Sequence, residues 1–283
     1  MWNKNIETFI GCDKPYEQAE IVLFGAPFDS TTSYRPGARF ASKAMRGESY
    51  GIETYSPYQD RDLEEVAVFD GGDLELPMGD TVLALNAIEQ AVNTLFQDGK
   101  RPLMIGGEHL VTLGALCAAV RRYPDLHIIH FDAHADLRED YLGVKLSHAC
   151  VMRRAHDLLG DGRIYQFGIR SGDKNEFLFA KEGHVRMQKF NFVGLEQIVA
   201  SLAGKPVYFT LDLDVLDTSV FPGTGTPEAG GVSFLELLDA MKEVTKCNII
   251  GCDINELAPN LDQSGGSTAV ACKVLRELLL LWC

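Results

Sequence analysis

Carboxylate and imidazole side chains gather in four short clusters of this chain, and each cluster directly follows a short apolar run. The clusters span residues 106–109, 132–136, 212–214 and 253–256. In the second cluster, Asp132, His134 and Asp136 occupy alternate positions, and alternate residues of an extended segment point the same way. Solvated loop acids would explain one isolated pair, but they are a poor explanation for four clusters that all follow predicted strands. The pattern indicates metal chemistry.

Six of these side chains form a set that is too anionic to stand alone. Four carboxylates and two imidazoles close together would repel one another until some took up protons, and divalent cations remove that problem. We therefore predict two metal ions, and Mn²⁺ suits the set because it contains no thiolate that would favour zinc. Two ions at ~3.5–4 Å separation activate a water molecule for hydrolysis. The six residues are His109, Asp132, His134, Asp136, Asp212 and Asp214.

The elements that must position these side chains alternate along the chain. Strands are predicted at 21–25, 102–105, 127–131, 163–169, 207–211 and 248–252. Helices are predicted at 81–97, 110–122, 149–159, 192–203, 233–245 and 267–281, the fifth with Ser233 as N-cap. Such alternation predicts an α/β fold with a mainly parallel sheet covered by helices on both faces, and ligands bind at the carboxyl ends of its strands. We expect residues 1–283 to form one domain, because no long linker or repeat interrupts them.

Composition narrows the class of partner. The formal net charge is −14 and no run of Lys or Arg stands out, which argues against nucleic acid and anionic membranes and favours a small cationic ligand. The seven cysteines are scattered and form no Cys-x-x-Cys pair, as expected for free thiols in a reducing cytoplasm. Residues 2–5 lead into no apolar stretch, and no apolar run approaches the ~20 residues of a membrane span. We expect a soluble, cytoplasmic protein.

From about residue 25 to the C-terminus, the chain resembles the ureohydrolase family of arginases and agmatinases, and most of all the bacterial agmatinases. The motifs that carry the resemblance are 33–40 (SYRPGARF), 106–109 (GGEH), 130–136 (HFDAHAD), 147–148 (SH), 212–217 (DLDVLD), 223–227 (GTGTP) and 253–256 (DINE). The resemblance implies an arginase-like three-layer α/β/α sandwich. It also implies a homo-oligomer, as a trimer or hexamer.

The resemblance further implies a role for each metal ligand. His109 would bind the first manganese ion and His134 the second. Asp132 and Asp212 would bridge the two ions. The remaining two acids of the set, Asp136 for the first ion and Asp214 for the second, would complete the ligand shells.

The resemblance also implies how the substrate is held. Glu256 would bind a planar guanidinium by paired hydrogen bonds, and Thr226 would lie in the loop that lines this pocket. His148 would contact substrate at the mouth of the cleft and shuttle protons. Asp136 or His148 would then protonate the leaving amine. With agmatine as substrate, the products would be urea and putrescine, a step of polyamine synthesis.

The substrate tail and the activity have alternatives. Arg138 stands where arginases use an Asn for the α-carboxylate and α-ammonium, which disfavours arginine and favours agmatine. An Arg could instead pair with the carboxylate of guanidinobutyrate. Ala149-Cys150 replaces the Gly-Thr found in many agmatinases, which predicts a cleft mouth of different shape. A catalytically silent regulatory homologue and a single-zinc deacetylase are further alternatives.

Four neighbouring residues are expected to have supporting roles. His130 should be a core residue, or should orient a metal ligand without being one. Glu108 is expected to be mainly structural, and Asp217 should fix its loop by hydrogen bonds. Cys150 is expected to be an ordinary buried thiol.

Overall fold

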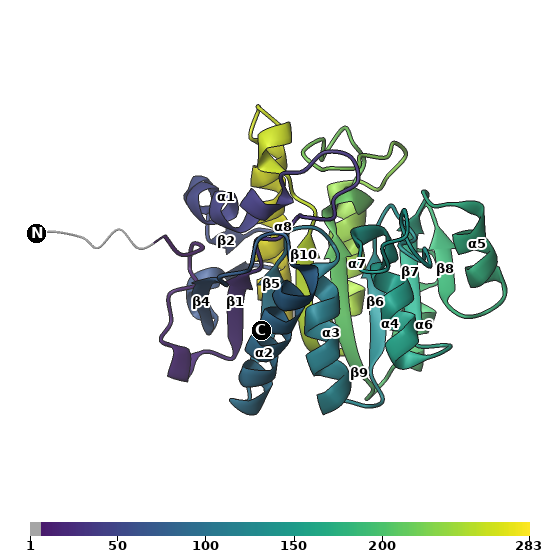
Figure 1. Cartoon of the computed structure of the whole chain (residues 1–283). Coiled ribbons are helices and arrows are strands. Elements are labelled where there is room, and N and C mark those ends of the chain that lie inside the picture. The colour runs from purple at the N-terminus through teal and green to yellow at the C-terminus, as the bar shows by residue number, and fades with distance from the viewer. Residues whose placement is uncertain (1–6) are drawn as a thin grey trace, which may run out of the picture.

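A single eight-stranded sheet forms the centre of the chain in the computed structural model, which describes residues 7–283. Residues 2–5, which contributed to the expectation of a cytoplasmic protein, lie outside this range. All neighbouring strands of this sheet pair in parallel. From one edge to the other (Figure 1), the strands are β4 (Val68–Asp73), β1 (Ile21–Gly25), β5 (Arg101–Ile105), β10 (Asn248–Asn255), β9 (Pro206–Asp212), β6 (His127–Phe131), β7 (Ile164–Ile169) and β8 (Arg186–Lys189). A small antiparallel ribbon pairs β2 (Tyr55–Ser56) with β3 (Arg61–Asp62).

The inner strands are continuous apolar runs because both faces of the sheet are covered. All five residues of β1 are buried, for example. Ile21 and Leu23 face one hydrophobic core, whereas Val22 and Phe24 face the other. Strands that are buried on both faces lose the polar alternation of a half-exposed sheet.

Helices form the two outer layers. On one face, α2 (Thr81–Gln97) packs against α3 (Val111–Arg122), which packs against α4 (Val151–Leu159), and α5 (Lys174–Lys181) contributes to the same core. The opposite core contains residues of α1 (Ala41–Glu48), α6 (Leu195–Ser201), α7 (Phe234–Val244) and α8 (Gly266–Trp282). The predicted α/β architecture of three layers is therefore confirmed (Figure 1).

The sequence patterns did not predict two short helices and the two edge strands of the central sheet. They are α1, α5, β4 and β8. The edge strand β8 reads RMQK and β4 ends in Asp-Gly-Gly-Asp, so neither has the apolar character of a buried strand. The two helices have only eight residues each, which leaves little periodicity to detect.

The four strands that precede the polar clusters are neighbours in the centre of the sheet, in the order β5, β10, β9, β6. The predicted meeting of the clusters at one sheet edge is thus confirmed. One boundary differs: β10 continues three residues beyond Cys252, so that Asp253 and Asn255 belong to the strand. Within residues 7–283, no helix combines the length and the apolar character that crossing a bilayer would require.

Candidate metal centre and substrate cavity

The loop after β5 passes very close to other backbone on its way to His109. A Cβ atom on Gly107 would lie only 1.9 Å from the carbonyl oxygen of Phe28, and one on Gly106 would lie 1.8 Å from Oδ1 of Asn255. Only glycine fits at these two positions. The Gly-Gly pair therefore brings His109 into the centre of the site.

His109 faces three of the predicted acidic ligands. Its Nδ1 lies 3.0 Å from Oδ2 of Asp132, 3.2 Å from Oδ2 of Asp212 and 3.5 Å from Oδ2 of Asp136. All four side chains are buried. One imidazole nitrogen and three carboxylate oxygens thus converge on one point.

His134 faces a second point next to the first. Its Nδ1 lies 3.0 Å from Oδ2 of Asp214 and 3.5 Å from Oδ1 of Asp132. Asp132 therefore turns one oxygen toward each imidazole. Oδ2 of Asp214 is buried and has no well-aligned hydrogen-bond donor, so its 3.0 Å contact with Nδ1 of His134 leaves it available to a cation. The structure brings all six predicted residues together, in two adjoining halves that share Asp132.

A hydrogen-bond network beneath the site determines the tautomer of His109. Thr210 donates its hydroxyl proton to Oδ1 of Asp253 (2.6 Å), and the Oγ1 of Thr210 is 2.8 Å from Nε2 of His109. The hydroxyl has no second proton, so Nε2–H of His109 must be the donor to it. In the neutral ring, Nδ1 then presents a lone pair to three carboxylate oxygens; without a cation, burial would lower the pKa of His109, but the contacts with Asp132 and Asp212 outweigh burial and raise it. Such an arrangement suits a cation between them.

This network follows from strand register. His130 on β6, Thr210 on β9 and Asp253 on β10 are direct partners in the parallel sheet. They form a row directly below the strand ends. Tyr208 and Asn255 also donate hydrogen bonds to Asp253 (2.8 and 2.7 Å), which holds this carboxylate in place.

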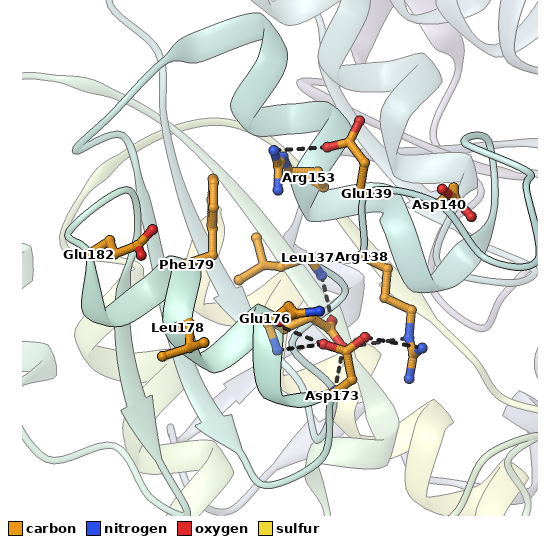
Figure 2. Close-up of a pocket in the computed structure, with 11 residues that line it drawn as sticks. Leu137, Arg138, Glu139, Asp140, Arg153, Asp173, Glu176, Leu178, Phe179 and Glu182 are labelled. Carbon is orange, nitrogen blue, oxygen red and sulfur yellow. Dashed lines mark hydrogen bonds and ion pairs between the residues drawn. The ribbon is translucent and has the colours of Figure 1, made fainter.

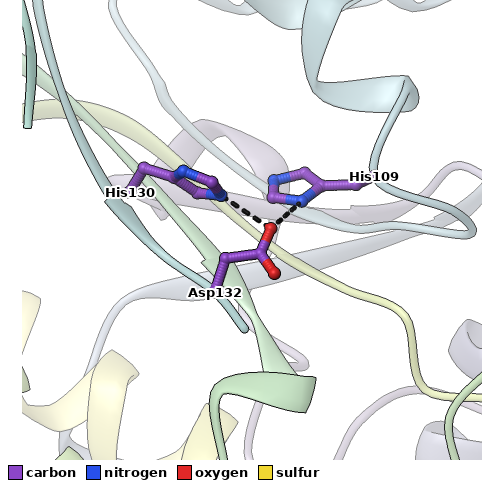
Figure 3. A group of neighbouring side chains, drawn as sticks. All are labelled: His109, His130 and Asp132. Carbon is purple, nitrogen blue, oxygen red and sulfur yellow. Dashed lines mark hydrogen bonds and ion pairs between the residues drawn. The ribbon is translucent and has the colours of Figure 1, made fainter. Parts of the chain in front are cut away.

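A hydrogen bond from His130 orients Asp132. Nε2 of His130 lies 2.8 Å from Oδ2 of Asp132 (Figure 3). Nδ1 of the same ring lies 3.0 Å from Nε2 of Gln166, which can only donate. His130 is therefore a neutral ring that donates through Nε2 to Asp132. This geometry fits the expected orienting role and leaves His130 without a lone pair for a metal ion.

The charges of the site are unbalanced without cations. Burial, reinforced by Asp132, raises the pKa of Asp136 well above its usual value. Burial, followed by the charges of Asp214 and Asp132, does the same to the pKa of Asp212. Burial would also raise the pKa of Asp132, but hydrogen bonds from His109, His130 and His134 outweigh it and lower that pKa. This is the repulsion that the sequence predicted, and the donor set fits divalent cations.

A cavity of about 180 Å³ opens beside His134 and Asp136. His148 and Thr226 also line it, as do Ser33, Ala135, Arg138, Tyr141, Ala149, Ser171, Gly172 and Glu176. Arg35 holds the loop that carries Thr226, since it donates hydrogen bonds to the carbonyl oxygens of Thr224 (2.7 Å) and Gly225 (3.3 Å). The site thus has a concave pocket next to the six donors.

His148 is largely buried in the wall of this cavity. Its Nε2 accepts a hydrogen bond from the backbone N–H of Ser33 (3.2 Å), so the neutral ring carries its proton on Nδ1, 3.9 Å from Oε1 of Glu256. Burial, followed by the positive charges of His134 and His109, lowers the pKa of His148 to about 4. His148 is therefore neutral at physiological pH.

Glu256 lies behind His148 and beside the first half of the metal site. Its Oε1 accepts a hydrogen bond from the backbone N–H of His109 (2.7 Å). Burial, reinforced by the carboxylate of Glu108, raises the pKa of Glu256 to about 8. Such a carboxylate gains strongly from a cationic partner.

Arg138 lies at the rim of the substrate cavity, where two carboxylates already balance its positive charge. It lies 3.4 Å from Oδ2 of Asp173 and 3.5 Å from Oε2 of Glu176 (Figure 2). Asp173 caps α5, and Glu176 completes its capping box and accepts the N–H of Leu137 (2.8 Å). Arg138 and Glu176 also line a neighbouring acidic pocket of about 460 Å³ (Figure 2).

The remaining expected residues have structural contacts. Glu108 is buried and accepts hydrogen bonds from the backbone and hydroxyl of Thr31. Asp217 accepts from Ser219 and from the N–H groups of Gly230 and Gly231, as expected of a residue that fixes its loop. Cys150 is a buried free thiol whose pKa burial raises to about 12.

Sequence reasoning assigned no role to Thr210, and none to Asp253 beyond its membership of the fourth cluster. The signal for Asp253 was its place in that cluster. Thr210 carried no signal, because only the register of β9 against β6 and β10 makes it a partner of His109.

The chain is similar in sequence and in fold to known proteins. The model of the arginase family matches residues 19–281. An agmatinase from Bacillus anthracis is 47% identical over 98% of this chain and 96% of its own length. A solved structure of a candidate agmatinase from Clostridium difficile is 53% identical, covers 95% of this chain and 98% of its own, and has a TM-score of 0.92. A guanidinobutyrase from Pseudomonas aeruginosa is 32% identical over 92% of this chain and 85% of its own length.

Proposed function

Because this chain belongs to the arginase family and is a ureohydrolase acting on guanidino compounds, we propose that its substrate is agmatine, which it hydrolyses to putrescine and urea. The reaction would supply polyamine synthesis. The observation that carries the proposal is the meeting of six candidate ligand side chains, five of them buried, beside a small cavity whose wall contains His148. The charge of −14 is compatible with a dicationic substrate.

We propose that the six donors hold two manganese ions. His109 and Asp136 would bind the first ion, His134 and Asp214 the second, with Asp132 and Asp212 bridging them. The lone pair of His109 Nδ1 and the free Oδ2 of Asp214 support this assignment. When bound, such a pair of ions supplies a nucleophilic water at neutral pH and polarises the electrophile.

Glu256 orients the guanidinium group in this proposal. A planar cation pairs with a carboxylate through parallel N–H···O hydrogen bonds, which fix the plane of the group as well as its position. One oxygen of Glu256 also accepts the N–H of His109, so the carboxylate itself cannot rotate freely. Thr226, held through its loop by Arg35, lines the neighbouring cavity.

The chain must also protonate the leaving amine. Water adds to the guanidinium carbon, the bond from that carbon to the alkyl nitrogen breaks, and the nitrogen leaves as an amine with one added proton. Asp136 and His148 both line the cavity, so either can deliver this proton. The neutral state of His148 makes it able to accept a proton from solvent and pass it inward.

The rim favours a cationic tail over a carboxylate tail. Asp173 and Glu176 already match the charge of Arg138, which leaves that guanidinium little attraction for a carboxylate of guanidinobutyrate or arginine. The terminal ammonium of agmatine would instead meet the excess of acidic groups at this rim. Agmatine therefore ranks above the other two compounds as substrate.

A substrate panel tests the proposal. The Mn²⁺-loaded protein is assayed for urea release from agmatine, guanidinobutyrate and arginine, with Arg138→Gln alongside the wild type. We expect agmatine to have the highest kcat/KM, and Arg138→Gln to change it by less than about fivefold, the scale of a solvent-exposed ion pair. If guanidinobutyrate is preferred and Arg138→Gln abolishes that preference, Arg138 binds the substrate carboxylate and the proposal for agmatine fails.

Urea release, together with the number of metal ions bound per chain, distinguishes the alternatives. A catalytically silent regulatory homologue would release no urea from any compound, and a single-zinc deacetylase would bind one ion per chain and not two. The intact set of six donors speaks against both.

We further propose that the chain forms one domain and that the protein is cytoplasmic. We also propose that it is a homo-oligomer, either a trimer or a hexamer; light scattering of the purified protein would test this oligomeric state.

A further inference from the structure

A second group of metal-ligand side chains lies at the far ends of α4 and α5. His156 belongs to α4, Asp161 to the turn that follows it, and His184 to the turn after α5. Nε2 of His156 lies 2.7 Å from Oδ1 of Asp161, and Nδ1 of His184 lies 2.8 Å from the same oxygen. None of the three lines the substrate cavity, and the proposed reaction uses none of them.

The two imidazoles are held in place by neighbouring groups. The ring of Phe179 stacks on His184 at 4.3 Å and meets the ring of His156 edge-on at 4.9 Å. The backbone N–H of Gly162 donates to the carbonyl oxygen of His184 (3.2 Å), which ties the two turns together. The imidazoles are therefore oriented by packing, and the exposed side chain of Asp161 can adjust between them.

The donor set and its geometry suit a transition-metal ion. Two imidazole nitrogens and a carboxylate oxygen are a common ligand set for Zn²⁺, with solvent in the fourth position. Bonds of ~2.0–2.1 Å in a tetrahedron place ligand atoms ~3.3 Å apart, so each N···O contact must open by only about half an ångström. In the metal-free site, hydrogen bonds from His156 and His184 lower the pKa of Asp161; a cation that replaces these protons would favour the same ionised carboxylate.

One imidazole also has a partner on its other side. Oε2 of Glu182 lies 3.8 Å from Nε2 of His184, the nitrogen that faces away from Asp161. The contact is longer than a hydrogen bond, but the nearby negative charge favours the proton on this outer nitrogen, which leaves the inner nitrogen free to bind.

We propose that His156, Asp161 and His184 form a second metal site, separate from the catalytic centre, that binds one divalent transition-metal ion such as Zn²⁺. The ion joins the end of α4 to the turn after α5. The opposite ends of these helices lie at the substrate cavity, since α4 follows His148 and α5 begins at the carboxylates that pair with Arg138. The site therefore braces the two helices that support this wall of the cavity.

Metal counting tests the site. The full-length protein is dialysed against buffered Zn²⁺ and its zinc content is measured for the wild type and for the double variant His156→Gln/His184→Gln. We expect the wild type to hold one more ion per chain than the double variant. An Asp132→Asn/Asp214→Asn variant, altered only at the catalytic centre, should keep this additional ion. Equal zinc content in the wild type and the folded double variant would overturn the proposal.

A milder pair of variants guards against misfolding. Asp161→Asn changes only an exposed side chain, and it should weaken zinc binding at this site by at least about tenfold, the scale at which a lost supporting contact weakens a metal site. Asp157→Asn makes the same chemical change on α4 outside the cluster and should leave zinc binding intact. Crystals soaked in Zn²⁺ should show an anomalous peak ~2.0–2.1 Å from the two imidazole nitrogens; no peak there would equally refute the site.

Discussion

Asp253 controls which nitrogen of His109 faces the metal-ligand carboxylates. It accepts the proton of Thr210, and Thr210 can then only accept from His109. A metal-binding histidine commonly depends on such a partner on its other nitrogen, which fixes both its tautomer and its orientation. We therefore regard Asp253 as a positioning residue for the proposed centre, although it lies too deep to touch an ion itself.

Asp253→Asn should weaken Mn²⁺ binding about 10- to 100-fold, the usual effect of losing an outer partner of a metal ligand. The amide can turn a donor toward Thr210, whose hydroxyl then donates to Nε2 of His109 and leaves the proton on Nδ1. Calorimetric titration of the metal-free protein with Mn²⁺ measures the change. Asp125→Asn is the control, because Asp125 is an exposed partner of Arg163 and Lys205. Unchanged Mn²⁺ affinity in Asp253→Asn would rule out the positioning role.

Glu256→Gln should cut kcat/KM for agmatine strongly while two metal ions remain bound. The amide loses the charge that pairs with guanidinium, and a charge-assisted hydrogen bond is worth ~1.5–3 kcal/mol, or roughly 10- to 150-fold. Its oxygen can still accept the N–H of His109, so the metal site is preserved. Steady-state kinetics combined with elemental analysis tests this. If Glu256→Gln also loses its metal ions, Glu256 stabilises the metal centre and does not bind the substrate.

Two candidate site residues have a backbone conformation that is uncommon for their type. Asp136 has φ of 53° and Glu256 has φ of 66°, both in the left-handed region that non-glycine residues avoid. Such strain persists only where surrounding structure imposes it, and it concentrates at functional sites. Here this backbone conformation turns the side chains of Asp136 and Glu256, which follow β6 and β10 along the chain, toward the candidate site.

At the scale of elements, the loop after β5 depends on close backbone packing. Gly107 passes against the carbonyl oxygen of Phe28, and its own carbonyl oxygen accepts the N–H of Glu256 (3.0 Å). This contact joins the loop that carries His109 to the residue that follows β10. The loop and the strand end therefore hold each other in position.

Gly107→Ala should lower both thermal stability and Mn²⁺ content, because the new Cβ must displace the loop from Phe28 or from Glu256. Differential scanning calorimetry and elemental analysis measure the two effects. Gly47→Ala is the matched control: it lies in α1 with no atom within 4 Å of the added Cβ, so it should be neutral or stabilising by ~0.5–1 kcal/mol. If Gly107→Ala behaves like Gly47→Ala, the close approach does not constrain the loop.

At the scale of the whole molecule, the buried carboxylates make folding depend on cations. Asp132, Asp136, Asp212 and Asp214 lie at or just after the carboxyl ends of the central strands β6 and β9, and all four are buried. Their mutual repulsion opposes the folded state, and cations that bind only the folded state offset it. The protein should thus be least stable when its metal ions are removed.

Removal of metal by a chelator should lower the melting temperature, and Mn²⁺ should restore it. An ion present at 100 times its Kd contributes ~2.7 kcal/mol per site. Calorimetry with and without Mn²⁺ checks this. Asp132→Asn, which removes the carboxylate that faces both imidazoles, should show a smaller response together with a lower metal content and rate. A wild-type melting temperature that is indifferent to Mn²⁺ would contradict the proposed centre.

Periodicity and motif order in the sequence determined the fold class and the set of candidate residues. Continuous apolar runs marked six of the eight strands of the central sheet, and the Ser233 capping box marked the start of α7. The clusters followed strands that proved adjacent, so all six donors could be named. Local sequence carries this information because burial on both faces requires apolar strands, and parallel strands place their carboxyl ends on one edge.

Only the tertiary structure decided what lies behind and around those donors. The row of His130, Thr210 and Asp253 exists because three strands are in register, and register is a relation between distant segments. The pairing of Arg138 with Asp173 and Glu176, which bears on the substrate tail, likewise joins residues more than thirty positions apart. Sequence spacing cannot reveal such contacts, because they depend on how the layers pack against one another.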